Sequence, residues 1–272
     1  MWTSRGTSAP PCGCKFAMLD LLDLLLLKRG VPPDDKTLAF RRIDGNAKAN
    51  VIYFLPWHTP FSVCRQAGFT PLDFLACYEM PCAIVSSDPE LGVKAMRRLV
   101  EDAEALLVSR RAAPAETLIV GLSVGTYPAI YLANRLGARV CAVAAADRGD
   151  LMLWQSPATR MVKRRAIQRG IRLWQFSQAM LGYHPAQNLA RIAENSVFVI
   201  GERDPFVPPR RRAALLQAIE RYRPAARVAM VAGGHVKTLV LSAQYQQAML
   251  GMAMQRKYWW LPGANAFEAA QV

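Results

Sequence analysis

The pentapeptide at residues 121–125, Gly-Leu-Ser-Val-Gly, places the strongest constraint on how this chain folds. It follows the short β-rich run Thr117–Val120 and precedes the apolar run Pro128–Ala133, which is typical of a buried helix. A strand that turns sharply into a helix holds the serine at its tip in a strained backbone conformation, and small flanking residues let the chain pass without a clash. The hydroxyl of Ser123 is then raised above the sheet at the positive end of a helix, so we identify it as a candidate nucleophile.

A serine nucleophile needs a base, and the base needs an orienting acid. His235 stands on a glycine-rich loop directly after the strand-like run Arg227–Val231, and Asp204 follows the apolar run Val197–Ile200. Serine, aspartate and histidine thus each come just beyond the carboxyl end of a predicted strand, the edge at which open α/β sheets bind ligands. The pattern predicts a catalytic triad of Ser123, Asp204 and His235.

Three segments in this order, 121–125, 201–208 and 233–235, resemble the α/β-hydrolase fold superfamily in its serine esterase and thioesterase form. The resemblance implies an α/β fold with a mostly parallel, eight-stranded sheet flanked by helices and topped by a helical cap, with no metal or organic cofactor. Some relatives place the acid after the strand that follows the nucleophile's helix, where this chain has Asp147. The Asp-Pro context of Asp204 matches the commoner position, so Asp147 is the alternative acid.

The family's oxyanion hole would involve the loop after the strand Asn50–Leu55, which here reads Pro56-Trp57-His58. The resemblance implies one backbone N–H donor from Val124 and a second from Trp57 or His58. Many members have His-Gly in place of Pro56-Trp57. The tryptophan narrows this loop, and we expect it to form a wall of the acyl pocket.

The chain of 272 residues with 52% hydrophobic residues is long enough for one sizeable catalytic domain. We expect four parts: a tail and amphipathic helix at 1–36, the first part of the core at 37–149, a helical cap at 150–184, and the second part of the core at 185–272. The cap is rich in large side chains, at least a few of which should line the pocket: Met152, Trp154, Met161, Trp174, Phe176, Met180, Leu181 and Tyr183.

Other apolar runs predict further elements of the α/β pattern. Strands are expected at Thr37–Ile43, Pro81–Ser86 and Arg139–Ala145, and helices at Glu90–Arg110 and Val236–Leu250.

The segment Phe16–Leu27 is strongly apolar but is interrupted by Asp20 and Asp23, which share one helical face. It is too short to span a bilayer, and no small-residue cleavage site follows it. We expect an amphipathic helix that packs on its own domain, with a dimer contact or attachment to a membrane surface as alternatives. No other segment has the pattern of a transmembrane helix.

The formal net charge is +14, with basic clusters at 148–172 and 210–212. One interpretation is a solvated arginine-rich surface. The other is a rim that attracts an anionic substrate or carrier, such as a coenzyme A thioester, an acyl carrier protein or an anionic lipid. No recognition motif accompanies the charge, so nucleic acid is not an expected partner.

The six cysteines do not form the pattern of a disulfide framework, which indicates a reducing, cytoplasmic compartment. Cys82 and Cys141 lie in apolar runs and are expected in the core. Cys12 and Cys14 have no matching cluster that would complete a metal site.

Together these features predict a serine hydrolase, monomeric or homodimeric, that cleaves a carboxylic ester or thioester with a hydrophobic acyl group. The same triad suits an acyltransferase or a carbon–carbon bond hydrolase, and a non-catalytic binding protein on this fold is the third alternative.

Overall fold

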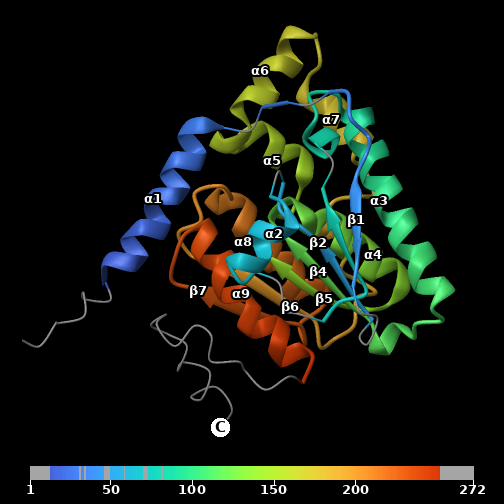
Figure 1. Cartoon of the computed structure of the whole chain (residues 1–272). Helices are drawn as coiled ribbons and strands as arrows, with labels where there is room; N and C mark the ends of the chain where they lie inside the picture. Colours follow the sequence, from blue (N-terminus) through green and yellow to red (C-terminus); the bar gives the residue numbers. More distant parts are fainter. Residues whose placement is uncertain are drawn as a thin grey trace, which may run out of the picture.

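The computed structural model describes residues 13–30, 32–33, 35–45, 50–57, 59–69, 73–80 and 82–251, and for residues 13–18 and 82 it describes the backbone alone. A seven-stranded sheet in the order β1-β3-β2-β4-β5-β6-β7 forms the centre of the molecule (Figure 1). Its strands are β1 (Arg41–Asp44), β2 (Val51–Phe54), β3 (Ala76–Glu79), β4 (Leu118–Leu122), β5 (Arg139–Val143), β6 (Val197–Gly201) and β7 (Arg227–Val231). Only the edge strand β1 runs antiparallel to its neighbour.

The helices alternate with these strands in the way that parallel pairing requires. The α-helices are α1 (Gly13–Arg29), α2 (Phe61–Gln66), α3 (Pro89–Ser109), α4 (Thr126–Leu136), α5 (Gly149–Gln155), α6 (Arg160–Gln168), α7 (Leu173–Ala179), α8 (Pro209–Tyr222) and α9 (His235–Met249). Short 3₁₀ turns are η1 (Cys82–Val85), η2 (Pro114–Glu116), η3 (Ser123–Gly125), η4 (Pro157–Thr159) and η5 (Pro185–Gln187).

Two apolar layers enclose the sheet. Helices α3, α4 and α8 pack on one face, and α2 and α9 pack on the other. Every residue of β2, β4 and β6 is buried, as expected for parallel strands covered on both sides. The predicted α/β architecture is therefore confirmed, although the described residues form seven strands and not the eight that the resemblance implies.

Most predicted elements are found within a few residues of their expected bounds, but one strand prediction is wrong. The run 81–86 is not a strand, because η1 occupies Cys82–Val85. The strand beside β2 is instead β3 at Ala76–Glu79, which pairs with both β1 and β2. A short apolar run fits a strand or a turn of helix equally well by periodicity, so its long-range pairing decides.

The buried thiols of Cys64, Cys77 and Cys141 are free. Burial raises the pKa of Cys64 to about 12 and that of Cys141 to about 12. The expected core position of Cys141 in β5 is therefore found, whereas the side chain of Cys82 lies outside the described residues.

The segment between β5 and β6 contributes helices α5, α6 and α7, which lie together at one end of the molecule (Figure 1). A hydrogen bond from Ser156 Oγ to the carbonyl oxygen of Phe206 (2.7 Å) ties this segment to the loop after β6. Its treatment as a separate cap, with boundaries at 150 and 184, stays a prediction.

The link between α1 and β1 is fastened to the same end of the molecule by one carboxylate. Asp35 accepts hydrogen bonds from the hydroxyl groups of Ser86 and Ser87 (both 2.7 Å) and pairs with Arg169 (3.1 Å) and Arg165 (3.3 Å). Burial opposes ionisation of this group, but the hydrogen bonds from the two serines and the charge of Arg169 lower its pKa to about 2.

We predict that Asp35→Asn lowers the free energy of unfolding at pH 7 by about 1–3 kcal/mol, because it leaves donors without their charged acceptor. A depressed carboxyl pKa stabilises the fold above the unfolded value of about 3.9 and ceases to do so as the pH falls toward about 2. Urea unfolding should therefore show a smaller difference between the two proteins at pH 3 than at pH 7.

The matched control is Asp44→Asn, which removes the same charge from a side chain that is 68% exposed. Its effect should stay within about 0.5 kcal/mol. An equal loss for Asp35→Asn at both pH values would show that ionisation of Asp35 does not stabilise the fold.

Candidate active site

The turn between β4 and α4 holds Ser123 in a left-handed conformation. Its φ is 54°, one of the few positive values at a non-glycine residue in the described chain. A Cβ atom added at Gly125 would collide with the carbonyl oxygen of Phe54 in the neighbouring strand, so only glycine fits there. The strained turn that the sequence predicts at this position is present.

The side chains of Ser123, His235 and Asp204 lie in series at the carboxyl ends of β4, β7 and β6. His235 Nε2 is 2.9 Å from Ser123 Oγ, and His235 Nδ1 is 2.7 Å from Asp204 Oδ2. Because a carboxylate only accepts hydrogen bonds, the proton on the ring sits on Nδ1. The other ring nitrogen, Nε2, is then left to accept the hydroxyl proton of the serine.

The backbone after β6 fixes the orientation of the aspartate. Asp204 Oδ1 accepts hydrogen bonds from the N–H groups of Phe206 (2.8 Å) and Val207 (3.3 Å), which leaves Oδ2 for the imidazole. The ring of Phe206 lies over that of His235 with centroids 4.5 Å apart. The imidazole is therefore held by a carboxylate at its edge and by an aromatic ring against its face.

Burial and charge act in opposite directions on His235. Burial of the ring alone would lower its pKa, because it disfavours the charged form. The charge and hydrogen bond of Asp204, together with the charge of Asp23, outweigh this effect and raise the pKa. The protonated form of the imidazole is thus more stable in this site than it is in water.

Asp147, the alternative acid, has a different partner. Its Oδ2 lies 3.0 Å from Arg211 Nη1 in α8, and both side chains are largely buried. Burial raises the pKa of Asp147, while the charge of Arg211 opposes that rise. Of the two candidate acids, only Asp204 forms a hydrogen bond to His235 in the described structure.

Sequence reasoning missed Asp23, which reaches the site from the N-terminal helix α1. Its carboxylate is buried and accepts a hydrogen bond from the N–H of Val236 (3.0 Å), the residue after His235. A Cβ atom added at Gly234 would collide with it. Burial raises the pKa of Asp23, and its hydrogen bond to Val236 opposes that rise. The available signal was an aspartate in an otherwise leucine-rich helix, but nothing local places it beside residue 235.

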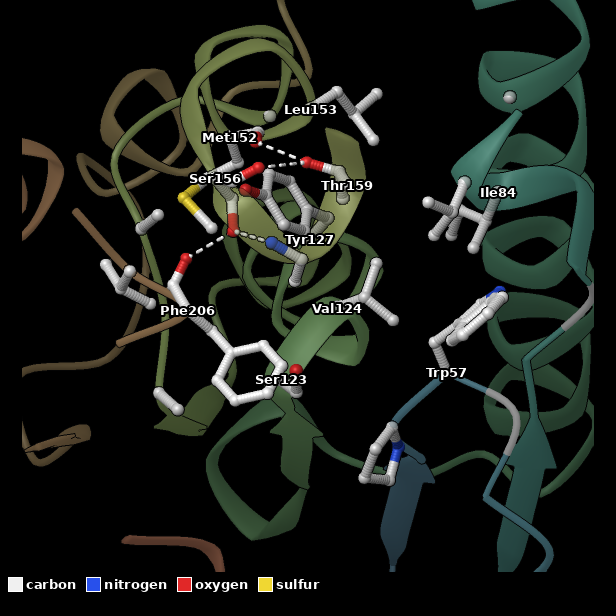
Figure 2. A pocket seen from close by; sticks show the side chains of 18 of the residues that line it. Trp57, Ile84, Ser123, Val124, Tyr127, Met152, Leu153, Ser156, Thr159 and Phe206 are labelled. Atoms are coloured by element: carbon white, nitrogen blue, oxygen red, sulfur yellow. Dashed lines mark hydrogen bonds between the residues drawn. The ribbon is translucent and has the colours of Figure 1, made fainter. Parts of the chain in front are cut away.

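Ser123 borders a cavity of about 660 Å³, and most of the surface that lines this cavity is apolar. In Figure 2, Trp57 and Ile84 stand on one side of the cavity, while Tyr127, Met152 and Leu153 stand on the other. Phe176 and Met180 of the segment between β5 and β6 also line it. Other large side chains of that segment are exposed and do not line it: Met161, Trp174 and Leu181.

The predicted oxyanion donors are only partly described. Val124 follows Ser123 in the 3₁₀ turn η3, and both Val124 and Trp57 line the cavity. Trp57 thus stands at the wall where the sequence places it (Figure 2). His58 lies outside the described residues, so the source of the second donor stays a prediction.

Several arginines of the two basic clusters contact other parts of the chain. Arg212 donates to the carbonyl oxygen of Gly201 (3.1 Å), Arg160 donates to carbonyl oxygens at the end of α1, and Arg148 pairs with the buried Asp150. His184 is also buried, with its Nε2 3.7 Å from Asp150 Oδ1, so it lies beside the pair of Arg148 and Asp150 and not beside Ser123. These contacts favour a structural role for much of the basic charge.

Among the described residues, no group of three or more His, Cys, Asp or Glu side chains is arranged to hold a metal ion. No helix in the described part of the chain combines the length and the apolar composition needed to cross a bilayer.

No protein-family model and no curated protein sequence matches the chain. Its arrangement is similar to that of an S-formylglutathione hydrolase from Agrobacterium tumefaciens, with 11% identity, a TM-score of 0.54, and coverage of 78% of this chain and 88% of that one. It is also similar to oligopeptidase B from Leishmania major, with 14% identity, a TM-score of 0.52, and coverage of 81% and 35%.

A puromycin-hydrolyzing peptidase from Mycobacterium tuberculosis gives a weaker match, with 16% identity, a TM-score of 0.49, and coverage of 75% and 34%. The chain therefore spans about a third of the length of the two peptidases that it matches.

We predict that Asp23→Asn lowers the pKa of His235, because it removes a buried negative charge that favours the imidazolium form. Titration of the imidazole by NMR measures this directly, and the three histidines of the chain can be assigned by single substitutions. Asp20→Asn, one turn earlier on the same helix, is the control and should shift the pKa less. An unchanged His235 pKa in folded Asp23→Asn protein would show that the charge of Asp23 does not act on the imidazole.

Proposed function

The chain has the α/β-hydrolase fold, and from that premise we propose that it is a serine hydrolase acting on a carboxylic ester or thioester through an acyl-enzyme intermediate. The observation that carries this proposal is the hydrogen-bonded series Ser123–His235–Asp204 beside an apolar cavity. Nucleophile, base and orienting acid need this mutual geometry for acyl transfer.

In the first half-reaction Ser123 Oγ attacks the substrate carbonyl carbon, while His235 Nε2 takes the hydroxyl proton. Asp204 holds the Nδ1–H edge of the ring and stabilises the imidazolium that forms. The backbone N–H of Val124 and a donor from the loop after β2 stabilise the oxyanion. The tetrahedral intermediate then breaks its bond to the leaving oxygen or sulfur, which takes the proton from His235.

In the second half-reaction a water molecule attacks the acyl carbon, and His235 again accepts the proton as base. Collapse of this intermediate breaks the bond to Ser123 Oγ, which regains its proton from His235, and the carboxylic acid leaves. The sequence of steps needs no metal or organic cofactor.

The cavity lining supports a hydrophobic acyl group, because Trp57, Met152 and Phe176 offer apolar surface and little hydrogen bonding. The name of the Agrobacterium neighbour states that it hydrolyses S-formylglutathione, which supports including thioesters. An anionic carrier such as coenzyme A or an acyl carrier protein receives less support, because Arg211 and Arg212 are engaged within the chain.

The alternative of a non-catalytic binding protein explains the site less well. A positive φ at Ser123 and a buried aspartate–histidine pair are both unfavourable features for a turn that only packs. An acyltransferase would use the same residues, and product analysis with competing alcohols distinguishes it from a hydrolase.

We predict that a fluorophosphonate forms a single covalent adduct on Ser123, detected by intact mass and peptide mapping. The adduct should be lost in Ser123→Ala and strongly reduced in His235→Ala, because the base activates the hydroxyl. Thr126→Ser, which keeps a hydroxyl three residues further along the chain at the start of α4, is the control and should react as the parent does. Labelling that persists in Ser123→Ala would reject Ser123 as the nucleophile.

We further predict that Asp204→Asn lowers kcat by about 10⁴-fold, because an amide favours the wrong imidazole tautomer. Asp147→Asn should instead lower stability by about 3–5 kcal/mol, since Arg211 loses its buried partner, and should leave kcat nearly unchanged. Hydrolysis of a short p-nitrophenyl ester and thermal unfolding measure the two effects. If instead Asp147→Asn lowered kcat and Asp204→Asn did not, Asp147 would be the acid that orients His235.

A further inference from the structure

Helix α1 is turned with its acidic stripe toward the protein and its leucines toward solvent. Asp23 is buried against the start of α9, and Asp20 is half-buried close to Gly234. On the outward side, five leucines are 40% to 62% exposed: Leu21, Leu22, Leu24, Leu25 and Leu26. We call these five residues the leucine face. The sequence predicts a helix that packs on its own domain, and the structure adds that the described part of the chain leaves the apolar side of this helix exposed.

Such a face is unusual for a surface helix, which normally buries its apolar stripe. A contiguous exposed apolar patch marks a surface that associates with something else. The hydrogen bond from the N–H of Val236 to Asp23 keeps α1 in this orientation, because turning the leucines inward would remove a buried carboxylate from its partner.

The leucine face is bordered by positive charge. Lys28 and Arg29 are exposed and lie one helical turn beyond Leu24 and Leu25, so they continue the same face. The residues of α6 include no acid, and Arg160 at its start donates hydrogen bonds to the last carbonyl oxygens of α1. Figure 1 shows α1 at the edge of the molecule, reaching the end that holds α5 and α6.

We propose that α1 docks the protein on an anionic lipid surface, with the leucine face in the interface and the basic residues beside it on the lipid headgroups. Apolar side chains next to lysine and arginine match the layered chemistry of such a surface. A second copy of the chain would present the same charge, and a net charge of +14 on each copy opposes that association.

The docking surface adjoins the cavity that contains Ser123. Leu26, Arg29 and Gly30 line this cavity, so the end of the leucine face forms part of its wall. Docking would therefore bring the cavity close to lipid acyl chains. This last step, which assigns an ester of a membrane lipid as the substrate class, rests on the proposed function, whereas the docking itself does not.

Flotation with vesicles tests the docking in the Ser123→Ala protein, so that turnover cannot alter the result. The protein should bind vesicles of equimolar phosphatidylglycerol and phosphatidylcholine better than vesicles of phosphatidylcholine alone, and added salt should weaken the binding. The double variant Leu21→Ser/Leu25→Ser should bind the anionic vesicles about tenfold or more weakly, because two side chains lose apolar burial.

The matched control is Val108→Ser/Tyr222→Ser, which removes two exposed apolar side chains from α3 and α8 and should bind as the parent does. Circular dichroism and hydrolysis of a water-soluble ester, measured with Ser123 restored, check that the leucine variant keeps its fold and basal activity. Absence of binding to anionic vesicles, or equal binding by the leucine variant, would overturn the proposal. So would a dimer in analytical ultracentrifugation that Leu21→Ser/Leu25→Ser converts to a monomer, because a second copy would then cover this face.

Because binding is measured without turnover, its failure is distinct from a failure of the proposed function. If the parent protein formed no fluorophosphonate adduct, the hydrolase would be rejected and the docking would stand. If the Ser123→Ala protein with its leucine face intact did not bind anionic vesicles, the docking would be rejected and the hydrolase would stand.

Discussion

Parallel pairing from β2 through β7 is the constraint on which the site depends. In register, Leu118–Leu122 of β4 pairs with β5, and Val197–Gly201 of β6 pairs with β7. The carboxyl ends of these strands therefore reach the same edge of the sheet, although the loops that follow them lie far apart in the sequence. A serine after β4, an aspartate after β6 and a histidine after β7 meet within hydrogen-bonding distance only because all three strands point the same way.

The electrostatic environment of His235 is assembled from both ends of the chain. Burial disfavours the imidazolium, Asp204 favours it through charge and a hydrogen bond, and Asp23 adds charge from α1. The helix that supplies Asp23 is the one that exposes the leucine face. One interaction, between Asp23 and the N–H of Val236, thus couples the orientation of an outer surface to the loop that carries the base.

The net charge of +14 conveys little by itself about what the site binds. Arg211 neutralises the buried Asp147, Arg169 pairs with Asp35, and Arg160 caps the end of α1. These arginines fasten the segment between β5 and β6, the link before β1 and the N-terminal helix to one another. A guanidinium group donates several hydrogen bonds in different directions. It can therefore link segments that are not joined by strand pairing or by a common helix.

The sequence by itself determined the strand–turn–helix at residues 117–133, the candidate serine, and the order of the acid and the base, because these depend on local spacing and backbone conformation. Only the tertiary structure decided that Asp204 bonds to His235 while Asp147 bonds to Arg211, that 76–79 and not 81–86 joins the sheet, and that Asp23 lies beside the base. Each of these depends on a contact between residues distant in the chain. Propensity and periodicity describe residues that are neighbours in the sequence, so they do not predict contacts between distant residues.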